Sequence, residues 1–231
     1  MEEKKENSDR ILEILNEKSS LKQDVFHTTI AVFNDFKSVM KETVAAYRIE
    51  LAQTDKRIAI EFIDKSEYEM HLKVAGDIII FSMHTNVFKF DTSHPITKTS
   101  YVKSNVYNSY CGVINVYNFL SDSFKYNRIN DIGYLIGRIF INRELHYYVE
   151  GKRKIGLRHN DFVNFKIDKV AIKDIIESLI LYCLEFDLYT PPFDSVGQIS
   201  VMEIQEAANN VLIKTGKRLG FQFMAEDNGA K

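Results

Sequence analysis

Hydrophobic and polar residues alternate almost strictly over residues 57–74. In the first run, Ile58, Ile60 and Phe62 fall on one side of the chain. After a polar break, the alternation resumes at Tyr68, Met70, Leu72 and Val74. Because successive side chains of a strand project to opposite faces, this pattern predicts an antiparallel hairpin with one buried face and one solvated face.

Strand patterns continue to about residue 157. Residues 78–84 are apolar on both sides, which predicts a strand inside the sheet. Further predicted strands cover residues 86–90, 110–120, 132–141, 145–150 and 155–157. The polar connection at 91–109 is long enough to be either functional or mobile.

The chain before the sheet has helical periodicity. Ser8 is a candidate cap for a short helix, and Ser20 with Gln23 forms a capping box for a second one. The second helix extends over residues 21–53 without Gly or Pro, with apolar positions three or four residues apart. At about 50 Å, such a helix must bend, break, or protrude and pack on a second copy of the chain.

The end of the chain is also helical in pattern. Asp168 is a candidate cap for an apolar helix over 170–188, which we expect to be deeply buried. The prolines at 191–192 end it. Ser200 with Glu203 forms another capping box, predicting a final helix to about residue 219.

Helices, then strands, then helices indicate an α+β fold. We expect a single domain over residues 1–231, with an antiparallel sheet of six to seven strands at 57–157. A long helix within 1–53 and two helices within 168–220 pack on that sheet.

Composition narrows the function classes. A net charge of −2 argues against broad electrostatic binding to nucleic acid or membrane. Cys111 and Cys183 fit two small buried side chains better than metal ligands, and we predict no metal site. The charged start and the lack of a long apolar stretch predict a cytoplasmic protein. The usual phosphate-loop, dinucleotide, hydrolase and zinc-protease motifs are missing, so no cofactor is predicted.

The best polar candidate is the segment 121–131, between two predicted strands. Lys125 and Arg128 are suited to hold a phosphate or carboxylate, and Asp122 and Asp131 could bind a metal or act as a base. The alternative is a solvated loop in which Asp and Asn side chains stabilise turns.

A sharper hypothesis joins Asp131 to Glu150 and Lys152. Two carboxylates and a lysine on neighbouring strands are the groups of a metal-dependent phosphodiesterase or nuclease. Such a short pattern often arises by chance, and 152–154 also fits an exposed basic turn. Among the histidines, His71 is expected on the solvated face of the first hairpin.

These observations favour a non-catalytic ligand-binding or protein-interaction module, with a metal-dependent nuclease as the alternative; whether the chain is an enzyme stays open. The expected partner is another protein or a small anionic ligand. The length of the N-terminal helix is also consistent with a homodimer formed through this helix. Nucleic acid is not the favoured partner.

Overall fold

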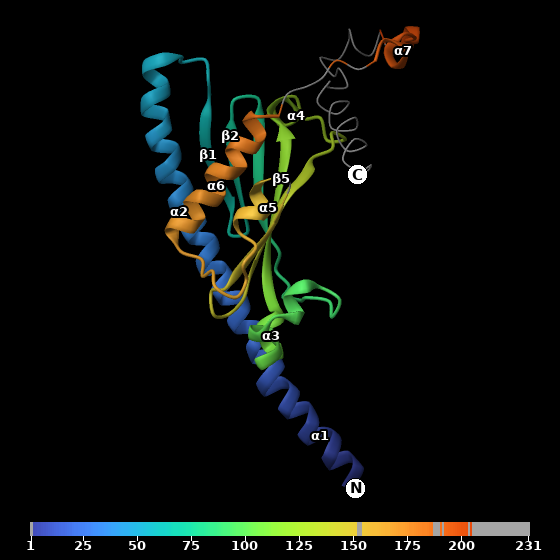
Figure 1. The fold of residues 1–231 in the computed structure, drawn as a ribbon. Helices are drawn as coiled ribbons and strands as arrows, with labels where there is room; N and C mark the ends of the chain where they lie inside the picture. The colour runs from blue at the N-terminus through green and yellow to red at the C-terminus, as the bar shows by residue number, and fades with distance from the viewer. Residues whose placement is uncertain (1, 152–153, 187–189, 191, 203, 205–231) are drawn as a thin grey trace.

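A computed structural model describes residues 2–151, 154–186, 190, 192–202 and 204 of the chain. Within these residues, α helices and a seven-stranded antiparallel sheet form an α+β fold, as predicted (Figure 1). The helices are α1 Glu2–Ile14, α2 Ser20–Thr54, α3 Ser100–Ser104, α4 Ser121–Lys125, α5 Lys154–Arg158, α6 Lys169–Leu184 and α7 Phe193–Val196. The strands are β1 Ile60–Ser66, β2 Glu69–Val74, β3 Asp77–Met83, β4 Phe88–Lys89, β5 Tyr110–Leu120, β6 Tyr134–Ile141 and β7 Tyr147–Gly151.

The sheet has the strand order β1-β2-β3-β5-β6-β7, and the short β4 pairs with β5. The predicted hairpin is present, with Ile60 opposite Val74 and Phe62 opposite Leu72. Its turn lies slightly later than the sequence indicates, because β1 continues to Ser66. Ile58 was expected in this strand, but it precedes β1 and is 45% exposed.

One face of the sheet is covered by α2 and α6 (Figure 1). Phe33, Phe36 and Met40 of α2 are fully buried against apolar side chains of the sheet and α6. At the crossing of α2 and β5, a Cβ atom at Gly112 would lie 2.0 Å from Thr29 Oγ1. Only glycine therefore permits this close approach of helix to strand.

The opposite face is covered at one end by the connection at 91–109. This connection folds into short helical turns, including α3, over a second apolar cluster. Its buried members are Ile96, Val102, Cys111, Val113, Phe140 and Phe162. The connection is therefore part of the packed structure at this end of the sheet.

The N-terminal helix differs from the prediction. A π-helical segment at Leu15–Ser19 joins α1 to α2, so no break occurs at the predicted capping box. Ser8, expected to cap a short helix, lies inside α1, and Ser20, expected to cap the second helix, has helical backbone angles. With no Gly or Pro nearby, the helix continues through residues that would also suit a cap. None of the helices in the described part of the chain is long and apolar enough to cross a membrane.

Two local predictions were wrong. The segment expected as a strand at 155–157 belongs to helix α5, because an alternation of three residues fits one helical turn equally well. Leu145, expected at the start of a strand, lies in the turn before β7 with φ of 67°.

The helix predicted over residues 170–188 is present as α6, but it ends at Leu184, several residues before the prolines that were expected to stop it. The Asp168 side chain accepts a hydrogen bond from the backbone N–H of Ala171 at 2.8 Å, as a helix cap does. At the next predicted capping box, the N–H of Ile204 donates to the carbonyl of Ser200. Glu203 and the predicted helix beyond residue 204 lie outside the described residues.

Candidate functional site

An open groove lies where α2 and α6 diverge over the edge of the sheet (Figure 1). Its volume is about 730 Å³, and its walls come from the last turns of both helices and from β1 and β2. The main apolar side chains along it are Leu51, Ile58, Ile60, Ile180, Leu181 and Leu184. The groove thus interrupts the helical layer that elsewhere seals the sheet.

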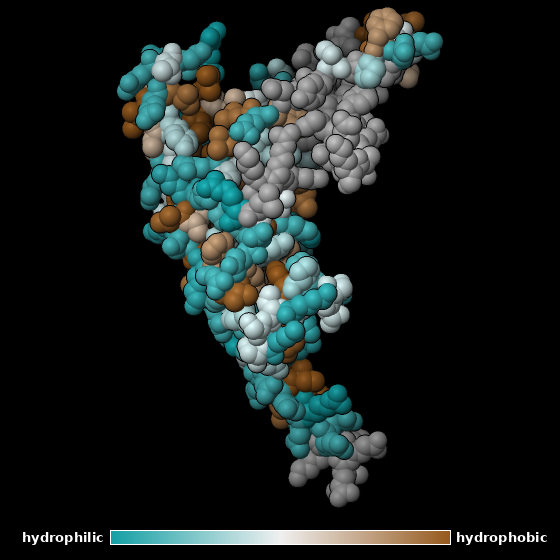
Figure 2. Space-filling view, in the orientation of Figure 1, coloured by the Kyte–Doolittle hydropathy of each residue, from teal (hydrophilic) through white to brown (hydrophobic). Residues whose placement is uncertain are grey.

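Helix α6 shows why the groove is apolar. Its sequence is hydrophobic around most of its circumference, but only one side contacts the core. Ile180 is 6% exposed, whereas Leu181 and Leu184 are 53% and 52% exposed. The expectation that this helix is deeply buried therefore holds for the side that carries Ile175, Ile176 and Leu179, and fails for the side at the groove. Figure 2 shows hydrophobic side chains gathered between the ends of the two helices.

The floor of the groove is part of the main core. Ile60, Val74 and Ile180 line it and are at most 6% exposed. Their packing against buried neighbours fixes the positions of the strands and helix below the exposed leucines. An incoming apolar group would therefore meet a preformed surface.

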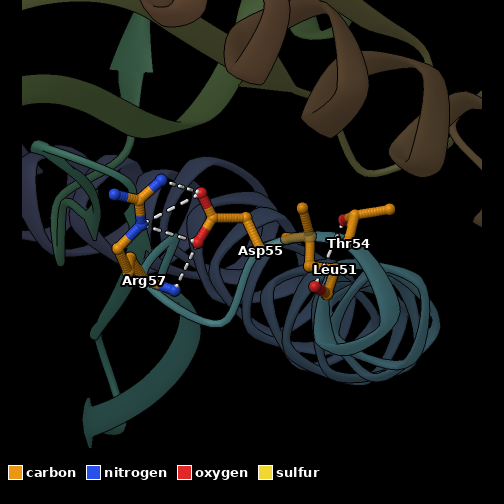
Figure 3. A network of polar contacts seen from close by, with 4 residues as sticks. All are labelled: Leu51, Thr54, Asp55 and Arg57. Atoms are coloured by element: carbon orange, nitrogen blue, oxygen red, sulfur yellow. Dashed lines mark hydrogen bonds and ion pairs between the residues drawn. The ribbon is translucent and has the colours of Figure 1, made fainter.

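The chain leaves α2 abruptly at one end of the groove (Figure 3). The N–H of Asp55 still donates to the carbonyl of Leu51, but Asp55 itself is extended, with φ of −144°. Its carboxylate accepts hydrogen bonds from Arg57 Nε at 3.0 Å and Nη2 at 2.7 Å. The Arg57 side-chain hydrogen bonds lower the pKa of Asp55. The backbone N–H of Arg57 also donates to this carboxylate at 2.9 Å, which closes the turn just before Ile58.

The polar part of the lining is acidic. The Tyr47 hydroxyl donates to Glu177 Oε1 at 2.8 Å and thereby joins α2 to α6. Burial, followed by the Glu177 contact, raises the pKa of Tyr47. Glu50 is exposed beside them, and the described lining residues include no Lys or Arg. The groove therefore offers apolar walls with negative charge at the edge.

The predicted polar loop at 121–131 is occupied by contacts within itself. Ser123 Oγ donates to Asp131 Oδ2 at 2.6 Å, and Arg128 Nε lies 3.4 Å from the same oxygen. The backbone N–H of Arg128 also donates to the carbonyl of Ser123. The Arg128 side chain is 5% exposed and the Asp131 side chain 24% exposed. The structure thus brings these two predicted residues together in a compact, mostly buried cluster.

The other two predicted residues of this loop lie at the surface. Asp122 and Lys125 are exposed, and Lys125 Nζ lies 5.0 Å from the centre of the Tyr126 ring. Phe124, on the same short helix, contacts His71 at a ring separation of 5.7 Å. This contact covers His71, which is 4% exposed, so its expected place on a solvated face was wrong.

The residues of the nuclease hypothesis have separate surroundings. Glu150 forms a cross-strand ion pair with Arg138, whereas Asp131 contacts Ser123 and Arg128. Lys152 lies outside the described residues. Within the part of the chain that is described, no three His, Cys, Asp or Glu side chains gather where they could hold a metal ion.

A hydroxyl, an imidazole and a carboxylate also lie in series near β7, at positions that no pattern in the sequence singled out. The Tyr147 hydroxyl is 2.9 Å from His159 Nδ1, and His159 Nε2 is 3.0 Å from Asp174 Oδ2. Burial raises the pKa of Tyr147 to about 12 and lowers the pKa of His159. Because Tyr147 is only 3% exposed, the series connects β7 to α6 and does not present a nucleophile.

The groove itself was missed by sequence reasoning. The available signal was the excess of apolar residues around α6, where Leu181 and Leu184 lie off the side that faces the core. Periodicity cannot tell whether the far side of such a helix meets another element or solvent. No protein-family model, curated protein or solved structure matches this chain.

Proposed function

We propose that this chain is a non-catalytic protein-interaction module whose groove binds one apolar face of a helical segment. The observation that carries the proposal is the pair of half-exposed leucines, Leu181 and Leu184, above a fully buried floor. Exposed, contiguous apolar surface of this kind marks interaction sites. Helix-in-groove recognition uses apolar anchors spaced three or four residues apart on the bound helix.

The openness of the walls favours a helix over a small molecule. Small-molecule sites enclose 70–90% of the ligand surface. Here Ile58, Leu181 and Leu184 are each about half exposed, so one side of any occupant would remain in solvent. An amphipathic helix meets this condition, because its polar side can stay hydrated.

The charge of the groove lining favours a bound helix that carries basic residues. Glu50 and Glu177 are the charged residues of the described lining. Lys173 Nζ lies 3.8 Å from Glu177 Oε1 and partly offsets its charge, so the exposed Glu50 is the main source of negative charge at the groove. A bound helix with Lys or Arg beside its apolar face would gain favourable contacts there. The proposed ligand is therefore a basic amphipathic helix.

The test uses a fluorescein-labelled Leu/Lys amphipathic peptide of 18 residues, titrated by anisotropy against the full chain at about 0.15 M salt to screen weak surface charge. The double variant Leu181→Asp/Leu184→Asp places two charges on the apolar wall. We expect its Kd to rise at least about tenfold, which corresponds to about 1.4 kcal/mol.

The matched control is Val170→Asp, which adds a charge at a 78% exposed position elsewhere on α6. It should leave the Kd unchanged, and a scrambled peptide of equal charge should bind weakly to every variant. Equal affinities of the wild type and the double variant would contradict the proposal. Thermal unfolding of each variant verifies that the fold is retained.

A second proposal concerns assembly. We propose that α1 pairs with a second copy of the chain, because it extends beyond the sheet (Figure 1) and its apolar side chains are exposed. Ile11, Leu12 and Leu15 are 57%, 54% and 51% exposed. Light scattering should give a dimer mass that becomes a monomer mass in Ile11→Asp/Leu15→Asp but not in Ser8→Asp. A wild-type monomer at high micromolar concentration would exclude this assembly.

The proposed setting is the cytoplasm. Cys111 and Cys183 are both free and buried, as suits thiols in a reducing compartment.

A further inference from the structure

The two edges of the sheet are covered to different degrees. At the β7 edge, the backbone N–H groups of Tyr147 and Val149 donate to the carbonyls of Phe165 and His159, respectively. At the opposite edge, β1 pairs only with β2, and no described residue forms a backbone–backbone hydrogen bond with its outer side. Strand β1 therefore keeps a capacity for pairing that β7 has already used.

The register of the first hairpin shows which backbone groups face outward. The N–H of Ala75 donates to the carbonyl of Ala59, directly before β1. Because residues of an antiparallel pair alternate between bonded and non-bonded positions, Ile60, Phe62 and Asp64 direct their N–H and C=O groups away from β2. These groups form a row about 14 Å long, which is left to solvent or to a further strand.

The end of this edge is shielded, but its beginning is not. Lys37 Nζ donates to the carbonyl of Ser66 at 2.6 Å and lies 2.7 Å from Asp64 Oδ1. The pairing register with β2 also shifts between Asp64 and Ser66. A lysine and an irregular strand end both discourage pairing with other chains. The first half of β1, from Ile60 to Ile63, has neither feature.

A hollow beside the start of β1 gives an added strand room for a side chain. Its volume is about 260 Å³, and it lies between the last turns of α2 and residues 58–61. Leu51, Ala52, Ile58 and Ile60 form the apolar part of its lining. A strand that pairs with β1 would therefore find an apolar space beside the backbone groups that it binds.

The unpaired charges at this hollow are basic. Arg48 and Lys56 line it, are exposed, and form no ion pair with any described residue. The two carboxylates of the lining are offset, because Asp55 binds Arg57 and Glu61 Oε1 lies 3.7 Å from a lysine of β2. The hollow therefore favours an acidic segment, whereas the groove between α2 and α6 favours a basic helix.

We propose that β1 binds an extended, acidic segment of another protein, which adds to the sheet as an antiparallel strand. Hydrogen bonds to the outer backbone groups of Ile60, Phe62 and Asp64 supply the affinity, and the hollow takes one apolar side chain. The antiparallel direction continues the pairing of the whole sheet and gives the more stable ladder. The proposal uses other groups than the helix-binding groove does, so each can fail without the other.

The experiment uses a fluorescein-labelled peptide of eight residues that alternates Val and Thr and carries Asp at both ends, titrated by anisotropy against the full chain. N-methylation of the alternate residues that face β1 removes their donors and should raise the Kd at least about tenfold. Methylation of the other alternate set, whose N–H groups face solvent, should leave the Kd unchanged. If the two methylated peptides bind alike, or the unmodified peptide does not bind, the proposal is wrong.

A charge reversal tests the preference for an acidic segment. Arg48→Glu should raise the Kd of the unmodified peptide at least about fivefold. The matched control is Lys22→Glu, the same change at an exposed position of α2 about 39 Å away along the helix. At about 0.15 M salt a charge at that distance is screened, so the control should bind as the wild type does. Equal effects of the two variants would show unspecific attraction and contradict the hollow as the site.

Hydrogen exchange of the full chain locates the contact. Saturating peptide should slow the exchange of the Phe62 and Asp64 amides at least about tenfold, because both amides face outward in the unbound edge. The amide of Ile63 already faces β2 and serves as the internal reference. An unchanged rate at Phe62 would overturn the proposal. Leu181→Asp/Leu184→Asp, which tests the groove, should bind this peptide with the wild-type Kd, and a raised Kd would place the peptide in the groove instead.

Discussion

The loop at 121–131 and the groove between α2 and α6 contrast in how far their chemical groups are already satisfied. The loop contains more charged and polar side chains, but those of Ser123, Arg128 and Asp131 contact one another. The groove has little polar chemistry, yet Leu181 and Leu184 remain half exposed above a closed core. Binding capacity is therefore better indicated by surface left without cover than by the number of reactive groups in a segment.

The largest effect that we expect is a loss of folding stability when the contact between Arg128 and Asp131 in the loop is removed. Arg128→Ala would remove a mostly buried guanidinium and leave Asp131 partly buried without it. Because Asp131 keeps some access to water, we expect a loss of about 2 kcal/mol, below the usual cost of breaking a fully buried pair. Urea unfolding measures it, and peptide binding in the groove should not change.

The matched control for this prediction is Lys125→Ala, at an exposed position in the same loop. Its effect should stay within about 0.5 kcal/mol. If Arg128→Ala keeps full stability while the protein loses affinity for inorganic phosphate, the loop is the anion site that the sequence suggested, and the contrast drawn above fails.

A smaller effect concerns pH. Burial lowers the pKa of His71 below its ordinary value of 6.5, although Glu69 partly opposes this shift. As pH falls below 6.5, the unfolded chain therefore binds a proton that the folded chain resists, and the free energy of unfolding decreases until the lowered folded-state pKa is reached. His159 acts in the same direction for the same reason.

His71→Phe should weaken this pH dependence between pH 7 and 5, because Phe packs against Phe124 without titrating. His27→Phe, at an exposed position, is the control and should keep the wild-type dependence. Urea unfolding at a series of pH values measures both. An unchanged slope in His71→Phe would show that burial under Phe124 does not govern this histidine.

Much of the fold follows from the sequence, for identifiable reasons. The alternation over residues 57–74 predicted the first hairpin and its buried side, except for Ile58, and Asp168 marked the start of α6. Both signals depend on local geometry alone. The failed strand at 155–157 was too short for its period to separate strand from helix.

The site was less accessible to sequence reasoning, because it depends on tertiary placement. The alternation predicted that His71 lies on the solvated face of the first hairpin, but it could not show that Phe124 would cover that position. Likewise, the apolar pattern of α6 gave no indication that Leu181 and Leu184 would remain open. Which segment covers a given face of a helix or sheet depends on the path of parts of the chain that are distant in sequence.

The most direct test of the central claim is to locate peptide binding by methyl NMR of the full chain. Titration with the Leu/Lys amphipathic peptide should shift the methyl signals of Leu51, Leu181 and Leu184, which line the groove. Ile129, an 84% exposed residue in the polar loop, should not shift. Shifts centred on Ile129, with the three groove leucines unchanged, would contradict the account.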